Sequence, residues 1–422
     1  MIPKLIEGKY YLIHDLQSQI GLGYLTLVRA GIIIEKELRA KLNFVGLLFG
    51  ESNFCFVLPK YYRKFKESEL QDYEISLIQD SLITYGRTTS LYTPSLFDEE
   101  GVICSPKLQA ANKIIEYYFK KGLLAPNREV QTSSYDDKVN WGKTVELATP
   151  LIINNKPLYF NPISVKSTKN EYHQITEIQK WLTQKSFELV GSMMFPSQSI
   201  NLTSNCFEDD KGYYINIIEG YLQNIYTDDE IALLQNMLVF LFKEIEVESS
   251  DIEVFGTRSF YRIWELANKV LWKDQFEALK TYIPFPIWEF NRENYLSKDT
   301  IIPDILLKTE TRFYIIDAKY YLPTFIRNKP KGQPNIESLT KQFLYEEILK
   351  EKFPNLEFVN IFCFPDEKHI DNNSPINVIT SELINGSVNF TESPYNSIIN
   401  VYIPPNSLLK NYVENLGARL EI

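Results

Sequence analysis

One short segment, residues 303–319, constrains the fold of this chain more than any other. Two short apolar stretches on either side of a polar turn around Glu310 predict a β-hairpin. Antiparallel pairing through this turn places Asp304 opposite Asp317, with the two side chains about 5 Å apart. Lys319 lies two residues after Asp317, so it points to the same face. Like charges at opposed positions destabilise a sheet, so this arrangement calls for a compensating cation.

A divalent metal ion between the two carboxylates would remove the repulsion. Carboxylate oxygens favour a hard ion such as Mg²⁺, which binds one or two carboxylates and keeps water molecules for contacts with substrate phosphates. Such an ion would polarise a phosphoryl oxygen and lower the pKa of an attacking water. Lys319 would orient that water or neutralise developing charge. The segment therefore predicts phosphodiester hydrolysis, and a surface hairpin with merely solvated side chains is the alternative.

The elements around the hairpin favour the hydrolytic interpretation. Apolar residues before the hairpin recur with helical spacing, and Glu265 lies at the edge of their stripe. A second helix after the hairpin carries Gln342 and Tyr345, which are three apart and share one face. The predicted order is helix (259–272), hairpin, helix (337–350) and buried strand (357–364).

This order, together with the spacing of the acids, resembles the PD-(D/E)xK nuclease superfamily. The matching motif residues are Pro303-Asp304, Asp317-Ala318-Lys319 and the helix-borne Glu265. The resemblance implies an α/β restriction-endonuclease-like core and a metal-dependent endonuclease. It also implies that Asp304, Asp317 and Glu265 bind Mg²⁺ and that Lys319 assists catalysis.

Residues for contact with DNA are harder to assign. The Gln342-x-x-Tyr345 pair is similar to that of RecB-type nucleases, which implies that it contacts DNA or braces the site; ordinary helix packing is the alternative. The net charge of −10 is unfavourable for a DNA-binding protein, because phosphate contacts supply most non-specific affinity. Either a local basic patch or a partner must then hold the DNA. Arg327, Lys329 and Lys331 form a candidate patch, or else a solvated loop.

Length and composition predict a folded chain of more than one domain. The 422 residues are long for one core, and 44% are hydrophobic. Four cysteines without Cys-x-x-Cys spacing argue against a zinc site or a disulfide framework, as suits a reducing cytoplasm. No signal peptide is evident, and the most apolar predicted helix, residues 231–242, is too short to span a bilayer. We therefore expect a cytoplasmic protein without a membrane segment.

The expected fold is an α+β amino-terminal region, residues 1–250, followed by the α/β nuclease core, residues 251–422. The first region would bind DNA or a partner, and a further division near residues 100–125 is an alternative. Within it, residues 23–59 alternate short apolar runs and turns, which predicts a β-meander. Ser105-Pro106 opens a helix that is expected to continue to Lys121.

Short matches in the amino-terminal region resemble two restriction families. Residues 54–60, which end in Pro-Lys, are similar to an early strand of McrC-type subunits. Residues 139–144 and 255–265 resemble LlaJI-type restriction endonucleases. The resemblance implies a partner for the nuclease. In such systems an McrB-like AAA+ protein, which hydrolyses ATP or GTP, drives or regulates the nuclease. Gly142-Lys143-Thr144 does not supply that activity here, because position 137 is Asp where a phosphate-binding loop needs glycine.

The leading hypothesis is a Mg²⁺-dependent endonuclease subunit of a restriction or phage-defence system. It would cut foreign double-stranded DNA with an AAA+ partner. One alternative is a self-sufficient type II enzyme that acts as a homodimer. The other is a non-catalytic DNA-binding or scaffold subunit that keeps a nuclease-like fold.

Overall fold

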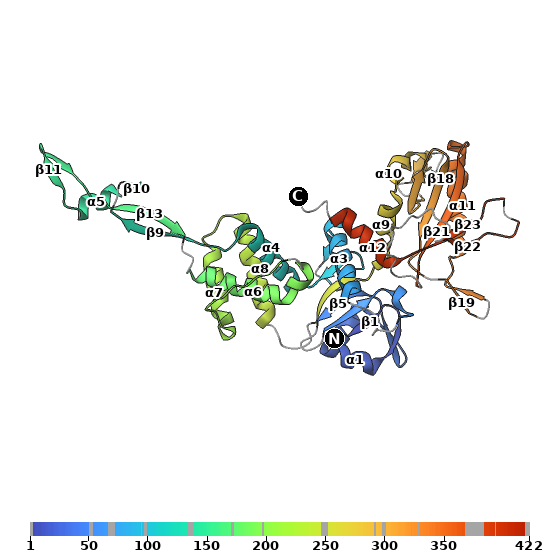
Figure 1. Ribbon diagram of the computed structural model, residues 1–422, viewed down its shortest axis with the longest axis horizontal. Helices are drawn as coiled ribbons and strands as arrows, with labels where there is room; N and C mark the ends of the chain where they lie inside the picture. The colour runs from blue at the N-terminus through green and yellow to red at the C-terminus, as the bar shows by residue number, and fades with distance from the viewer. Residues whose placement is uncertain are drawn as a thin grey trace. The chain divides into compact units, whose positions relative to one another are not determined.

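The chain folds into two compact units (Figure 1). Unit 1 contains residues 1–105 and 249–422, and unit 2 contains residues 106–248. The computed structural model describes residues 3–49, 54–65, 72–93, 95–96, 99–133, 135, 138–169, 173–195, 198–245, 252–290, 293–297, 301–321, 323–326, 329–367, 384–392 and 394–417.

A six-stranded mixed sheet in unit 1 joins the two ends of the sequence. Its order is β1 (Lys4–Ile6), β6 (Phe54–Leu58), β5 (Val45–Phe49), β14 (Glu253–Thr257), β8 (Val102–Cys104) and β7 (Tyr92–Thr93). β14 pairs antiparallel with both β5 and β8. Gly46 and Gly256 face each other there, and a Cβ on Gly256 would lie only 2.2 Å from the Val45 carbonyl oxygen. These glycines let β14 pack closely against β5.

This sheet changes the expected division of the chain. Two consecutive domains, 1–250 and 251–422, were expected, but β14 completes a sheet that is otherwise built from the first 105 residues. The boundaries between the units therefore fall at 105/106 and 248/249. Unit 2 is an insertion between two strands that are neighbours in one sheet.

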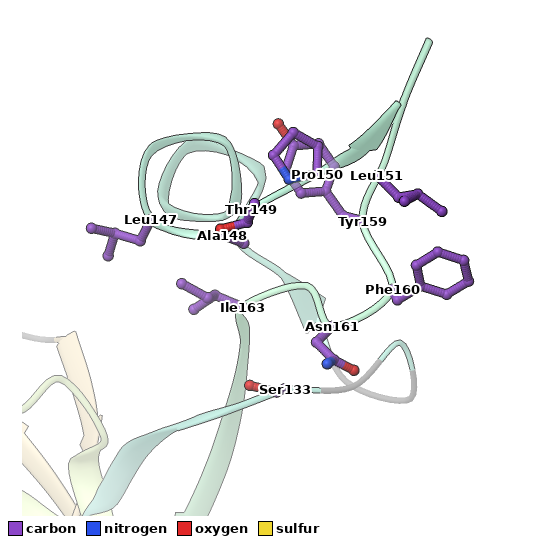
Figure 2. A pocket seen from close by; sticks show the side chains of 10 residues that line it. All are labelled: Ser133, Leu147, Ala148, Thr149, Pro150, Leu151, Tyr159, Phe160, Asn161 and Ile163. Atoms are coloured by element: carbon purple, nitrogen blue, oxygen red, sulfur yellow. The ribbon is translucent and has the colours of Figure 1, made fainter. Parts of the chain in front are cut away.

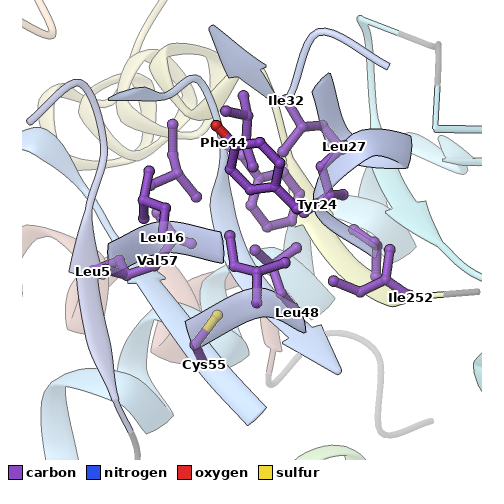
Figure 3. Packing of buried hydrophobic residues seen from close by; sticks show 14 of the residues in the cluster. Leu5, Leu16, Tyr24, Leu27, Ile32, Phe44, Leu48, Cys55, Val57 and Ile252 are labelled. Carbon is purple, nitrogen blue, oxygen red and sulfur yellow. The ribbon is translucent and has the colours of Figure 1, made fainter. Parts of the chain in front are cut away.

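One face of the six-stranded sheet is covered by residues 10–42, which form a hydrophobic core with it (Figure 3). The elements are β2 (Tyr10–Leu12), α1 (Ile13–Ile20), α2 (Tyr24–Arg29), β3 (Ile33–Lys36) and β4 (Arg39–Leu42). The expected meander is found only in part, because β3 pairs with β4 and β5 pairs with β6, but the two pairs lie in different sheets and residues 24–29 form helix α2. Tyr24 and Leu27 are three apart and both buried, so helical spacing lets this segment bury one face.

The second sheet of unit 1 contains the predicted hairpin. Its order is β17 (Ile305–Lys308), β18 (Arg312–Ala318), β21 (Glu357–Pro365), β23 (Ile398–Ile403) and β22 (Ile384–Val388). β17 and β18 are antiparallel, while β18, β21 and β23 run parallel. Helix α9 (Phe260–Trp272) packs on β17 and β18, and α11 (Ile336–Lys352) packs on β18 and β21. The expected order of helix, hairpin, helix and strand is confirmed.

Smaller elements complete unit 1. α12 (Pro405–Gly417) packs against α9 and against α3 (Asp72–Thr89). The chain between α9 and β17 forms α10 (Phe276–Leu279) and the hairpin of β15 (Ile287–Phe290) and β16 (Glu293–Leu296). After β18, β19 (Thr324–Ile326) and β20 (Lys329–Lys331) form another hairpin.

Unit 2 is a helical bundle with a β-rich arm. The bundle contains α4 (Pro106–Lys121), α6 (Gln174–Met194), α7 (Lys211–Leu222) and α8 (Asp228–Ile245). The arm contains β9 (Asn127–Thr132), β10 (Lys138–Val139), α5 (Trp141–Leu147), β11 (Leu151–Ile153), β12 (Lys156–Leu158) and β13 (Ser164–Lys169). A pocket of about 530 Å³ lies in the arm beside Pro150 and Phe160 (Figure 2).

The Gly142-Lys143-Thr144 sequence lies inside α5 of this arm. Asn140 caps the helix, because its side chain accepts a hydrogen bond from the Lys143 amide. The Thr144 hydroxyl donates to the Ile163 carbonyl oxygen and accepts from the Ile163 amide. This sequence thus has a structural role in the arm. None of the helices in the described ranges has the length and apolar character needed to cross a membrane.

Candidate active site

The β17–β18 hairpin has the register that the sequence predicts. Ile305 pairs with Ile316, and Leu306 pairs with Ile315. Asp304 immediately precedes β17, and Asp317 is the last residue but one of β18. The turn chemistry fixes this register, since Thr309 accepts from the Arg312 amide and donates to its carbonyl oxygen.

The two carboxyl groups interact directly. The Ala318 amide donates to Asp304 Oδ2 at 2.9 Å. Burial, followed by the negative charge of the neighbouring Asp317, raises the pKa of Asp304 to about 7. Asp304 therefore gives up its proton less readily than an ordinary carboxyl group. A cation can take the place of that proton, so this donor set fits a hard metal ion.

Lys319 extends this cluster on the same side of the strand. Its Nζ lies 2.5 Å from Asp317 Oδ2 and donates to Ser338 Oγ at 3.2 Å. The Asp317 and Lys319 side chains are 19% and 17% exposed, so a solute can still reach them. The structure thus brings together Asp304, Asp317 and Lys319.

Glu265 does not join this cluster. It lies at the edge of the buried face of α9, as expected, but its carboxylate binds Lys269 Nζ at 2.7 Å. Within the part of the chain that the structure describes, no three acidic, histidine or cysteine side chains lie close enough to share one metal ion. The donor set seen around Asp304 therefore contains two carboxylates.

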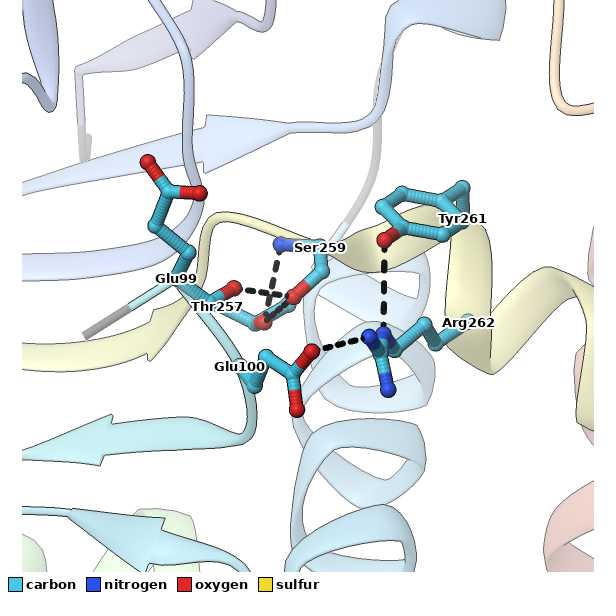
Figure 4. A network of polar contacts seen from close by, with 6 residues as sticks. All are labelled: Glu99, Glu100, Thr257, Ser259, Tyr261 and Arg262. Carbon is cyan, nitrogen blue, oxygen red and sulfur yellow. Dashed lines mark hydrogen bonds and ion pairs between the residues drawn. The ribbon is translucent and has the colours of Figure 1, made fainter. Parts of the chain in front are cut away.

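The beginning of α9 is held by a polar network (Figure 4). Ser259 Oγ donates to the Glu99 carbonyl oxygen at 2.6 Å, and Thr257 Oγ1 accepts from the Ser259 amide. Arg262 pairs with the Glu100 carboxylate. These contacts fix the helix that carries Glu265 to the loop before β8.

Gln342 and Tyr345 are buried beneath the site. Gln342 is 1% exposed, and its Nε2 donates to the Ile361 carbonyl oxygen on β21 at 3.5 Å. Tyr345 is 6% exposed and packs with Leu306. Burial and the nearby charges of Asp304 and Asp317 raise the pKa of Tyr345 to about 12. Both positions favour a bracing role over contact with DNA.

The candidate basic patch is described only in part. Arg327 lies outside the described residues. Lys329 and Lys331 lie on β20, which pairs with β19. This hairpin follows the candidate catalytic strand β18 in the sequence.

Two contacts near the cluster could not be predicted from the sequence. Ser338, which holds Lys319, lies in the first turn of α11 after the Asn335 cap, and only that cap position gives a local signal. Tyr320 donates its hydroxyl to Glu7 at 2.6 Å. No sequence pattern links two residues so far apart in the chain.

Comparisons with known proteins agree with the resemblance seen in the sequence. The chain is 26% identical over 420 residues to the type II restriction enzyme BsuMI component YdjA of Bacillus subtilis (strain 168), across 93% of this chain and 85% of that protein. Two solved assemblies from Thermococcus gammatolerans are weakly similar. The half-complex of McrB AAA+ hexamers with bound McrC has 13% sequence identity to this chain and a TM-score of 0.41, and the match covers 100% of both chains. The McrBC complex has 12% identity and a TM-score of 0.24, and the match covers 63% of this chain and 85% of that chain.

Both TM-scores are too low to establish a common fold. The family assignment rests instead on a sequence model described as LlaJI restriction endonuclease, which matches residues 44–389. That range is most of the chain and contains Asp304, Asp317 and Lys319. The protein therefore belongs to the LlaJI restriction endonuclease family.

Proposed function

We propose that this protein is the Mg²⁺-dependent DNA endonuclease subunit of a restriction system, with a PD-(D/E)xK-type site at Asp304, Asp317 and Lys319. The observation that carries the proposal is the placement of two opposed carboxylates, Asp304 and Asp317, beside the amine of Lys319. A stable hairpin has no structural need for two half-buried acids side by side.

The residues of the chain would act in defined ways. Asp304, after losing its proton to solvent, and Asp317 would hold the metal ion through their carboxylate oxygens. When bound, Mg²⁺ supplies positive charge that polarises the scissile phosphate and activates water. Lys319, freed from Asp317, places its ammonium group where negative charge develops on the phosphate. Ser338 keeps the amine in reach, because its hydroxyl accepts a hydrogen bond from Lys319 Nζ.

Glu265 enters the proposal as a third ligand. Because its carboxylate is bound to Lys269, it would have to exchange that amine for the metal when DNA and Mg²⁺ are bound. Gln342 and Tyr345 would brace the site from below. Arg327, Lys329 and Lys331 would contact the DNA backbone next to the cleaved bond.

A partner protein is part of the proposal. The net charge of −10 leaves little general affinity for DNA, and the chain lacks a complete phosphate-binding loop. The Bacillus subtilis relative is named as a component of a restriction enzyme. An AAA+ ATPase or GTPase would supply the nucleotide hydrolysis and part of the DNA contact.

Restriction of a plasmid that the intact system cuts tests this function. We expect Asp304→Ala and Lys319→Ala to abolish restriction while the protein stays folded. Glu310→Ala is the matched control, because Glu310 is an exposed acid in the turn of the same hairpin. Restriction by Asp304→Ala at the wild-type level would overturn the proposal.

A further inference from the structure

A buried hydrogen bond joins the segment just after the candidate catalytic strand β18 to the turn just after β1. The Tyr320 hydroxyl donates to Glu7 Oε2 at 2.6 Å. Tyr320 is 4% exposed and Glu7 is 9% exposed. Tyr320 directly follows Lys319, so this contact lies next to the proposed site in the chain, while Glu7 directly follows β1 of the six-stranded sheet.

Glu7 is held rigidly on its own side. Its amide donates to the Leu58 carbonyl oxygen at 2.8 Å, and the Lys60 amide donates to the same Oε2 at 3.2 Å. Arg63 Nε donates to the Glu7 carbonyl oxygen at 3.4 Å. Burial raises the pKa of Glu7, and the positive charge of Lys60 opposes this shift. The carboxyl group is thus a fixed acceptor within a buried network.

The ring of Tyr320 is enclosed as firmly as its hydroxyl. Aromatic neighbours lie around it, with centroid distances of 6.2 Å to Tyr61, 5.6 Å to Phe260 and 6.3 Å to Trp264. Lys60 Nζ lies 4.1 Å above the ring. The turn after β6, the turn after β1 and helix α9 therefore define where Tyr320 sits.

The position of Tyr320 determines how well Lys319 is held. The β18–β21 ladder ends at the pair Ala318–Cys363, and the Lys319 amide makes one further bond to the Cys363 carbonyl oxygen at 2.8 Å. Beyond this bond, the Tyr320 side chain anchors the chain through its hydrogen bond, and the Tyr321 ring packs against Phe364. Successive side chains of an extended strand point to opposite faces, so anchoring Tyr320 in the interior directs Lys319 toward Asp317.

We infer that Glu7 and Tyr320 are positioning residues of the nuclease site, and that residues before 106 are part of the machinery that sets the geometry of Lys319. This inference rests on the proposed nuclease function. Neither residue touches the substrate; both act through the backbone of the strand end. A misplacement of a reacting group by about 1 Å can lower a rate by up to about a hundredfold.

Single-turnover cleavage tests this inference. The assay uses the full-length protein, its co-encoded partner, Mg²⁺ and a saturating amount of the plasmid that the system restricts. We expect Tyr320→Phe to lower the rate roughly tenfold or more, with unchanged affinity for DNA. Glu7→Ala should lower it similarly, and the double variant should lose little more than either single variant. Glu7→Gln should retain most of the rate, because its amide oxygen still accepts the Tyr320 hydroxyl.

Tyr62→Phe is the matched control. The Tyr62 hydroxyl makes an equally short, buried bond of 2.6 Å, but to Asn406 Oδ1 on α12. We expect this variant to unfold at a lower temperature and to cleave at the wild-type rate per folded molecule. A wild-type rate for Tyr320→Phe, or an equal loss for Tyr62→Phe, would overturn the positioning role. Cleavage by Asp304→Ala at the wild-type rate would instead overturn the proposed function itself.

Discussion

Asp304 and Asp317 face each other across the β17–β18 hairpin, and the charge of Asp317 adds to burial in raising the pKa of Asp304. Two ionised acids cannot remain in this arrangement without a proton or a cation between them. The hairpin therefore couples its own stability to whatever occupies that space, and this coupling can be measured without any DNA.

The first prediction concerns pH without metal. Asp304 keeps its proton up to about pH 7 in the folded protein, whereas in the unfolded chain it loses that proton near its ordinary pKa of 3.8. Protonation thus stabilises the folded state at low pH, and this contribution is lost as the pH rises from about 4 to 7. Asp304→Asn removes the ionisation. In EDTA at pH 8 we expect this variant to exceed the wild type by up to about 4 kcal/mol in unfolding free energy.

Chemical denaturation across that pH range measures the effect. The difference between Asp304→Asn and the wild type should grow as the pH rises. Glu310→Gln, in the turn of the same hairpin, should show no such trend. If the difference in unfolding free energy between Asp304→Asn and the wild type did not change with pH, the raised pKa of Asp304 would be wrong.

The second prediction concerns Mg²⁺. A ligand that binds only the folded state raises its stability, and here the ion must displace the proton on Asp304. Added Mg²⁺ should therefore raise the melting temperature more at pH 8 than at pH 6. Asp317→Asn should remove the shift at both pH values, because it takes away one of the two carboxylates. An unchanged shift in Asp317→Asn would show that the ion binds elsewhere.

The sequence predicts the hairpin and its neighbours well, for local reasons. The turn fixes the strand register, and apolar residues with helical spacing mark α9 and α11. Pro106 marks the start of α4, which ends at Lys121 as expected. Each of these sequence signals lies inside or directly next to the helix or strand that it predicts.

The sequence does not predict contacts between residues that are far apart along the chain. Nothing near Glu7 indicates that its carboxylate will meet Tyr320, and nothing near Glu253 indicates that β14 will enter the first sheet. Glu265 lies at the edge of its apolar stripe as expected, but its nearest partner is Lys269, one turn away on the same helix. The Glu265–Lys269 pair is itself a local pattern, since residues four apart share one face of a helix. Tertiary packing decides the other two contacts, and no local pattern in the sequence encodes them.

The third prediction separates bracing from DNA contact at Tyr345. Its ring packs in the core with Leu306, Phe313 and Ile315. Tyr345→Ala should therefore lower the unfolding free energy by about 3 kcal/mol or more, through loss of buried area and the cavity left behind. Tyr345→Phe keeps the ring and should cost far less. If Tyr345→Ala left stability unchanged and weakened DNA binding alone, the bracing role would be wrong.

The last prediction concerns the insertion of unit 2. The Ser105 amide donates to the Val254 carbonyl oxygen at 3.0 Å, and Cys104 pairs with Phe255 across β8 and β14. The chain thus leaves unit 1 and returns to it at adjacent antiparallel strands, which a short turn can join. We replace residues 106–251 with a short Gly-rich turn, so that β8 and β14 become a hairpin.

This shortened chain should fold as one cooperative unit and keep the Mg²⁺-dependent rise in melting temperature, because both sheets and the Glu7–Tyr320 bond remain. It should lose restriction of plasmids if unit 2 selects the target or binds the partner. A fragment of residues 251–422 is the comparison, and it should not fold cooperatively, since β14 lacks β5 and β8 and Tyr320 lacks Glu7. Calorimetry on the two proteins measures the difference. Cooperative, Mg²⁺-responsive unfolding of the 251–422 fragment would show that the carboxy-terminal part is an independent domain after all.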